Sequence, residues 1–379
     1  MLYICLKIFP MEASRFIPTG HLKALVNKTV AWQSPSNIAL VKYWGKYDPQ
    51  IPANPSISFT LNQCTTKTSV RLKPIKKEAV IREGSFSFDF HFEGAPKPDF
   101  HPKIDAFFAR VVAYLPFLKE YHFDIHSENT FPHSSGIASS ASAMAALSLC
   151  LLELSGTFFK QGETAFTEAF FEKASFLSRL GSGSASRSIS GPLMQWGKTP
   201  SFTNSQDLIA TPFKDVAPIF MKYQDTVLLV DKGEKVVSST LGHGLMKAHP
   251  YAKARFQQAH DQLAILKEAL VSGDMETFIS VVESEALTLH AMMLTSNPYF
   301  ILMKPGTLSI IEKVWRFRKD TGLPLCFTLD AGANVHLLYP EIHRKEILQF
   351  IENELVVHCQ NGQYICDQVG SGSKPIHNP

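Results

Sequence analysis

The sequence has none of the short signatures of the common enzyme classes. It contains no GxxxxGK, GxGxxG, HExxH or GxSxG motif, so the usual nucleotide, metalloprotease and hydrolase sites are not indicated. Its six cysteines are scattered and form no CxxC pair. Neither a zinc site nor a disulfide framework is therefore predicted, and free thiols suit a reducing, cytoplasmic location.

Excess charge and long apolar runs are also missing. The net charge is only +3, from 37 basic and 34 acidic residues, which gives no polycationic face for nucleic acid. No run of about 18 apolar residues is available to span a membrane. The apolar start has Lys7 in its middle and lacks a cleavage site, so it makes a poor signal peptide, and Met11 is an alternative start. The 379 residues, 45% of them hydrophobic, are enough for two globular domains.

One stretch organises the chain. In Phe131–Leu147, FPHSSGIASSASAMAAL, a proline and a run of small residues lead directly into an apolar helix. Free backbone N–H groups and serine hydroxyls would converge at the N-terminus of that helix, which is how proteins build anion sites. Phosphate is the natural ligand. The alternative is a small-residue helix start that packs tightly against a sheet.

A second segment places cations at a strand end. Asn37–Val41 forms a short apolar strand, and Lys42, Tyr43 and Lys46 follow it. Lysines and aromatics together suggest the mouth of an anion-binding pocket. An edge strand whose lysines reach along its surface to water would have the same composition.

A third segment alternates glycine with hydroxyl residues. Arg179–Gly191, RLGSGSASRSISG, follows a predicted helix over 163–179 and precedes a Met-Gln-Trp strand. Such composition is usual in flexible linkers, but linkers rarely occur between elements so closely spaced. We interpret it as a ligand loop in which Ser182 and Ser184 donate hydrogen bonds and Arg187 binds a carboxylate or phosphate.

Asp330 opens a fourth segment, the DAGAN turn between predicted strands at 324–329 and 335–339. An aspartate here can simply form the turn. Alternatively, a carboxylate at the end of a buried strand could serve as a general base if Lys42 and Arg187 lie beside it.

The remaining elements follow from periodicity. Residues 11–30 are patternless and predict a loose arm, and the glycine- and serine-rich segment from residue 370 predicts a disordered tail. Four phenylalanines at alternate positions over 86–92 predict a strand with a core face. Further strands are predicted at 67–72, 121–125, 219–221 and 226–230, and helices at 104–114, 250–271, 275–290, 305–321 and 341–354.

These segments carry a family resemblance. Pro132-x-x-x-Gly136-Ile-Ala-Ser139-Ser140-Ala-Ser142 resembles the phosphate loop of the GHMP small-molecule kinase superfamily. Three further blocks resemble diphosphomevalonate decarboxylases: NIALVKYWGK from Asn37, GSGSASRS from Gly181, and DAGAN from Asp330. The blocks occur in the order of the family.

The resemblance implies an α+β, two-domain GHMP-kinase fold. Its N-terminal domain would be like ribosomal protein S5 domain 2 and its C-terminal domain ferredoxin-like, with the active site between them. We place a flexible arm at 1–20, the N-terminal ATP-binding domain at 21–205, the C-terminal domain at 206–368 and a tail at 369–379.

The resemblance also implies the reaction: ATP-dependent decarboxylation of mevalonate 5-diphosphate. Asp330, Lys42 and Arg187 match catalytic positions. Substrate contacts would come from Tyr43, Lys46, Ser182, Ser184 and Arg187, with Lys247 as a further basic contact. ATP phosphates would be held by Pro132, Gly136, Ser139, Ser140 and Ser142, and Ser140 would also bind Mg²⁺. The family makes a homodimer plausible.

Some positions depart from the family pattern, notably Tyr47, Pro55, Ser186, Ala333 and the segment 238–250. Relatives that phosphorylate mevalonate, or that act on mevalonate phosphate, share most of the same frame. The alternative interpretation is therefore a kinase, or a decarboxylase, that acts on a less phosphorylated substrate.

Overall fold

The computed structural model describes residues 11–19, 24–75, 86–132, 137–156, 166–233 and 239–377. Its larger sheet has eight strands: β1 (Thr29–Val41), β4 (Ser56–Pro74), β5 (Ser87–Phe92), β6 (Ala95–Pro96), β7 (Tyr121–Asn129), β8 (Leu193–Trp196), β9 (Thr211–Pro212) and β14 (Lys374–Pro375). They run in the order β14-β1-β4-β7-β5-β6, with β8 added to β4 and β9 to β8. A short hairpin joins β2 (Lys46–Tyr47) to β3 (Ile51–Pro52).

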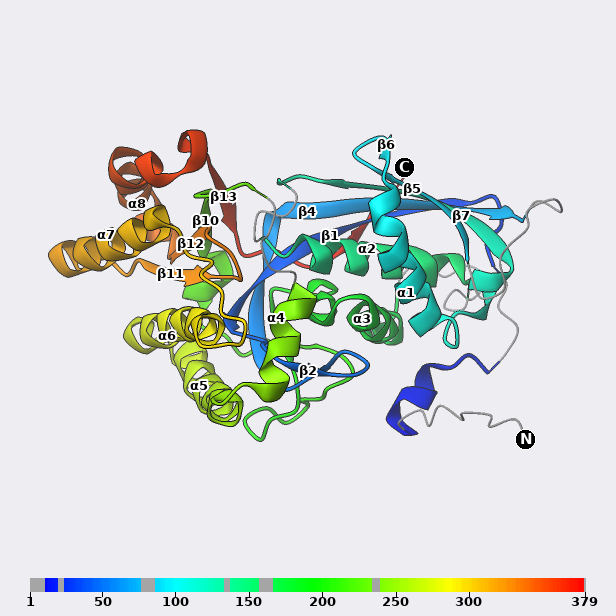
Figure 1. The fold of residues 1–379 in the computed structure, drawn as a ribbon, viewed down its shortest axis with the longest axis horizontal. Helices are drawn as coiled ribbons and strands as arrows, with labels where there is room; N and C mark the ends of the chain where they lie inside the picture. The colour runs from blue at the N-terminus through cyan, green and yellow to red at the C-terminus, as the bar shows by residue number, and fades with distance from the viewer. Residues whose placement is uncertain are drawn as a thin grey trace.

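Three helices cover one face of this sheet: α1 (His101–Val111), α2 (Ser139–Leu154) and α3 (Glu168–Gly181) (Figure 1). Small residues let α2 approach the sheet closely, so that Ala141, Ala145 and Ala146 are fully buried. Phe88 and Phe90 of β5 point into the same core, which confirms the predicted core face of that strand.

The second sheet is antiparallel and has four strands: β10 (Gln224–Leu228), β11 (Cys326–Leu329), β12 (Val335–Tyr339) and β13 (Tyr364–Gln368). The order is β11-β12-β10-β13. Its helices are α4 (Ser239–Leu245), α5 (Ala252–Ser272), α6 (Met275–Leu294), α7 (Pro305–Thr321) and α8 (Arg344–Phe350). The two-domain α+β architecture is thereby confirmed (Figure 1).

The domains share a core where the end of β1 meets α5 and α6. Ile38 and Phe59 from the first domain belong to one buried cluster with Leu263 and Phe278 from the second. This packing brings the residues that follow β1 against the second domain. Within the described ranges, no helix is long and apolar enough to cross a membrane.

Three predictions of local structure are wrong. Residues 219–221 lie in a 3-10 helix, Pro218–Lys222, where the proline at the first position favours a helical turn over a strand. The arm is not loose, because Phe16 is buried and stacks on Phe176 at 4.3 Å. The segment after residue 370 is ordered: Gly370 N–H donates to the Thr60 carbonyl, and β14 pairs with β1.

Candidate active site between the two domains

Lys42 and Asp330 meet where the two sheets end. Lys42 follows β1 in the first domain, and Asp330 follows β11 in the second. The Lys42 Nζ and the Asp330 Oδ1 are 3.3 Å apart, and the side chains are 2% and 25% exposed. The Lys42 ammonium also donates to the Ala39 carbonyl at 2.7 Å. Burial lowers the pKa of Lys42, and the Asp330 carboxylate acts in the opposite direction, so the two charges support each other.

A buried ion pair fixes the backbone of Lys42. Arg255 on α5 and Glu285 on α6 form two hydrogen bonds, at 2.7 and 2.6 Å, and neither side chain is exposed. Glu285 accepts from the Lys42 N–H at 2.8 Å, while Arg255 donates to the Lys42 carbonyl at 3.1 Å. Sequence reasoning missed this pair. Both helices carry several charged residues, so no feature of the sequence singles out these two.

Arg187 lies near this pair, in a 3-10 helix formed by Gly183–Ser188. Its guanidinium donates to the Ser56 hydroxyl and, at 3.4 Å, to Asn37 Oδ1. Burial lowers the pKa of Arg187 to about 10, and Asp330 acts against this shift. The predicted trio of Lys42, Asp330 and Arg187 is therefore brought together.

Asn37 holds the glycine- and serine-rich loop in place. Its side-chain amide donates to the Ser188 hydroxyl at 2.8 Å and to the Ser184 carbonyl at 3.2 Å. The loop is thus an ordered part of the site and not a flexible linker. Such fixed geometry is what a ligand loop requires.

The other predicted substrate residues differ in their surroundings, and Tyr43 is more enclosed than Lys46 or Lys247. Its ring packs on Trp196 with centroids 4.7 Å apart, and its buried hydroxyl has no hydrogen-bond partner in the described parts of the chain. Lys46 is half-buried and donates to Gln50 Oε1 at 2.9 Å. Lys247 is exposed on a 3-10 turn. Among the described residues, no hydrogen bond or ion pair joins it to the others.

The start of α2 lies beside the Gly-Ser loop. The Ser140 hydroxyl is 3.5 Å from that of Ser182, and the backbone of Ala138, which precedes the helix, has a left-handed φ of 44°. Pro132 is half-buried just before this region, while Gly136 lies outside the described residues.

Ser142 does not join Ser139 and Ser140 at the helix end. It is fully buried, and its hydroxyl forms hydrogen bonds with Thr66 Oγ1 at 2.6 Å and with the Ser139 carbonyl at 3.1 Å. The expectation that this hydroxyl faces a phosphate is corrected. One turn into the helix, the side chain at position 142 points toward the sheet.

Two histidines that we did not assign to the site lie in it. His290 on α6 bonds through Nε2 to the carbonyl of Asp330, 3.2 Å away, and burial lowers its pKa to about 4. His243 on α4 is in ring contact with Tyr43. Neither residue belongs to one of the motifs. Sequence reasoning could not assign them, because only the tertiary structure brings α4 and α6 to the site.

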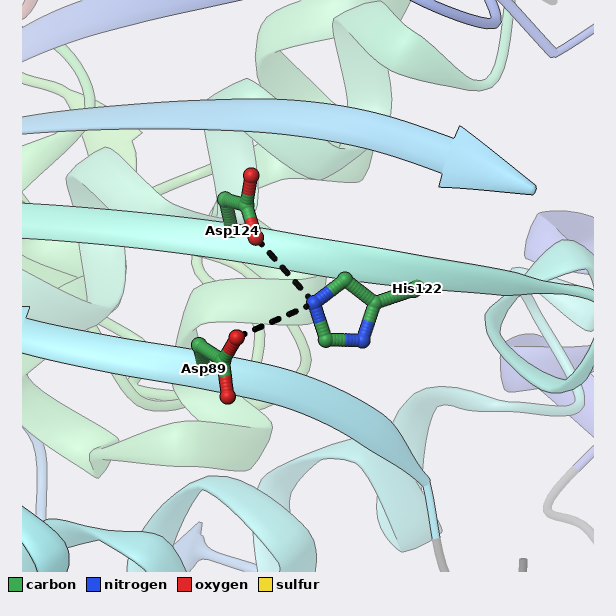
Figure 2. Close-up of side chains that lie close together, drawn as sticks. All are labelled: Asp89, His122 and Asp124. Atoms are coloured by element: carbon green, nitrogen blue, oxygen red, sulfur yellow. Dashed lines mark hydrogen bonds and ion pairs between the residues drawn. The ribbon is translucent and has the colours of Figure 1, made fainter. Parts of the chain in front are cut away.

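A separate cluster lies on β5 and β7. His122 Nε2 is 3.3 Å from Asp89 Oδ2 and 3.1 Å from Asp124 Oδ1 (Figure 2). Lys73 forms an ion pair with the other Asp124 oxygen, and Ser87 Oγ is 2.8 Å from His122 Nδ1. These partners already satisfy the charges and ring nitrogens, so we interpret the cluster as an ion-pair network on the sheet.

Comparison with known proteins agrees with this geometry. Residues 34–208 match the family model described as diphosphomevalonate decarboxylase-like N-terminal domain. Residues 226–375 match the mevalonate 5-diphosphate decarboxylase C-terminal domain. A solved complex of MDDEF with MVAPP, AMPPCP and magnesium superposes with a TM-score of 0.77 and 25% identity, covering 92% of this chain and 99% of that one.

Fold and site together define a two-domain protein of the GHMP-kinase fold. The chain belongs to the diphosphomevalonate decarboxylase family. It is 29% identical to the diphosphomevalonate decarboxylase of Saccharomyces cerevisiae, over 85% of this chain and 81% of that protein. It is 25% identical to the phosphomevalonate decarboxylase of Haloferax volcanii, over 80% of this chain and 86% of that protein.

Proposed function

We propose that this protein catalyses the ATP-dependent decarboxylation of mevalonate 5-diphosphate to isopentenyl diphosphate, with release of CO2, ADP and phosphate. The observation that carries the proposal is the Lys42–Asp330 pair, 3.3 Å apart at the junction of the two domains. The reaction makes an alcohol into a leaving group and then eliminates it together with a carboxylate. It therefore requires a base, a cation beside that base and a second cation for the carboxylate.

In this proposal Asp330 orients the 3-hydroxyl of the substrate and accepts its proton as the oxygen attacks the γ-phosphorus of ATP. Phosphate then leaves from C3, the bond to the carboxylate carbon breaks, and that electron pair forms the double bond. Lys42 stabilises negative charge on the transferred group, because its ammonium is already held by Asp330 and the Ala39 carbonyl.

Arg187 is the proposed contact for the substrate carboxylate. Its guanidinium is held by Ser56 and Asn37, so it can orient a carboxylate with little further loss of side-chain freedom. Tyr43, Lys46, Ser182 and Ser184 are proposed to contact the diphosphate or orient the substrate. Lys247, which is exposed, is proposed as a further basic contact.

The described end of α2 suits ATP and Mg²⁺. Within the described residues no side chain caps this helix, so its first N–H groups can bind phosphate oxygens. The exposed Ser140 hydroxyl is a hard oxygen ligand of the type Mg²⁺ prefers. We propose that Ser139 and Ser140, together with Pro132 and Gly136, hold the ATP phosphates. A bound Mg²⁺ would neutralise and align phosphate charge during transfer.

One assay tests the reaction. Purified protein is given ATP, Mg²⁺ and, in turn, mevalonate, its phosphate and its diphosphate, while ADP, phosphate and CO2 are measured together. We expect equal amounts of all three products with the diphosphate. ADP without CO2 would establish a kinase instead, and preference for the monophosphate would place the chain with the Haloferax volcanii relative.

A homodimer and a cytoplasmic location are further proposals, which rest on the family resemblance and on the scattered cysteines respectively. Light scattering at micromolar concentration tests the first, and fractionation of the source cells tests the second.

A further inference from the structure

His243 lies beside the proposed substrate site but matches none of the motifs. It belongs to α4, and its ring lies 4.3 Å from the ring of Tyr43 and 4.8 Å from that of Trp44 by centroid. Only 7% of the residue is exposed. Gly242 allows this contact, since a Cβ atom there would come within 2.5 Å of the Trp44 ring.

The hydrogen bonding of His243 fixes its tautomer. The Gly45 N–H donates to Nδ1 at 2.9 Å, so Nδ1 must carry the lone pair. Burial, together with the nearby Lys46 and Arg187 charges, lowers the pKa of His243 to about 3. The imidazole is therefore neutral at working pH and its proton is on Nε2. In the described parts of the chain, Nε2 makes no hydrogen bond.

The ring of His243 lies among one unpartnered hydroxyl and two cations, Lys46 and Arg187. The Tyr43 hydroxyl is buried and without a partner among the described residues. Lys46 and Arg187 are close enough to His243 to influence its ionisation. An unpartnered hydroxyl and an imidazole N–H beside two cations are together suited to an anion with several oxygens. A neutral donor also binds such an anion without repelling the two cations.

We propose that His243 Nε2–H donates to the diphosphate of the substrate and makes the site favour the diphosphate over the monophosphate. This inference rests on the proposed function. It adds a residue from the second domain to the diphosphate contacts, so the substrate would be held from both sides of the cleft. The position lies within the segment 238–250, whose sequence departs from the family pattern.

Two substitutions separate the two ring nitrogens. His243→Asn can still accept from the Gly45 N–H but cannot present a donor at the Nε2 position, whereas His243→Gln can present that donor but loses the Nδ1 acceptor. We expect His243→Asn to raise KM for mevalonate diphosphate on the order of tenfold, as a lost hydrogen bond to a charged group would. Its kcat and the KM for ATP should stay within about threefold, and His243→Gln should recover most of the affinity.

The substrate preference is the kcat/KM for the diphosphate divided by the kcat/KM for the monophosphate. In His243→Asn this ratio should fall by the same factor. His343→Asn, in a 3-10 turn of the second domain, serves as the matched control and should resemble the wild type. The inference would be overturned if His243→Asn kept the wild-type KM and the wild-type substrate preference while His243→Gln lost activity. That result would assign the ring a structural role. Failure of the proposed function is distinguishable, because the wild-type protein itself would then release no CO2 from the diphosphate.

Discussion

Asp330, the proposed base, contacts a cation through its side chain and a histidine through its backbone carbonyl. Its carboxylate faces Lys42 at 3.3 Å, and its carbonyl is bonded by His290 at 3.2 Å. The turn itself is fixed further along, where Thr307 Oγ1 donates to the Ala333 carbonyl at 2.6 Å. With its carboxylate held by Lys42 and its backbone carbonyl held by His290, Asp330 can keep one orientation toward a substrate hydroxyl.

The first prediction belongs to this residue. Asp330→Asn removes the proton acceptor but keeps the size of the side chain, so we expect substrate binding to persist and kcat to fall on the order of 10³-fold or more. Steady-state CO2 release and equilibrium binding of mevalonate diphosphate measure the two effects. Asp320→Asn, an exposed carboxylate on α7, is the control. Turnover near wild type would remove Asp330 from the mechanism.

Local signals specify some elements well and others poorly. The helix predicted over 305–321 is α7 to the residue, because Pro305 begins it and Gly322 ends it with a left-handed φ of 71°. The predicted helix 341–354 is instead divided into a 3-10 turn, α8 and a π-helical turn, Ile351–Leu355. Pro340 precedes the start of this segment, but no proline or glycine marks its C-terminal end.

At the element scale, His290 on α6 makes the free energy of unfolding depend on pH. The pKa of this buried ring is lowered from 6.5 to about 4, so the folded protein binds fewer protons than the unfolded chain between those values. Stability from this group is present above pH 6.5 and is lost as pH falls toward 4. The difference corresponds to roughly 3 kcal/mol.

We therefore expect His290→Gln to flatten the decline in unfolding free energy between pH 6.5 and 4. Urea denaturation at closely spaced pH values measures the slope for the variant and the wild type. His343→Gln, on a 3-10 turn outside the helix, should keep the wild-type slope. An unchanged slope in His290→Gln would show that the ring does not carry this linkage.

At the scale of the whole molecule, hydrogen bonds connect the two domains in addition to the chain segment between them. Asp367 on β13 accepts hydrogen bonds from the N–H groups of Asn62, Gln63 and Cys64 in β4, at 2.9, 2.8 and 2.7 Å. The Arg255–Glu285 pair clamps Lys42 from the opposite domain. The C-terminal strand β14 then returns to the first sheet.

The clamp gives a prediction for the whole molecule. Glu285→Gln leaves the Arg255 guanidinium buried without its counter-charge, which we expect to lower the unfolding free energy by about 3–5 kcal/mol. The amide offers one acceptor oxygen in place of two for Arg255 and the Lys42 N–H, so Lys42 is held less firmly and CO2 release should also slow. Chemical denaturation and the coupled assay report the two effects. Glu312→Gln, exposed on α7, should change neither, and wild-type stability in Glu285→Gln would contradict the role of the clamp.

The sequence by itself determined the family, the α+β class and the residues Lys42, Arg187 and Asp330, because local motifs and periodicity are properties of short segments. Only the tertiary structure decided that these three side chains meet, that Ser142 faces the sheet, and that His243, Glu285 and His290 belong to the cleft. Contacts between residues hundreds of positions apart depend on how helices and sheets pack. Such packing arises from the fit of whole buried surfaces, which no short segment records.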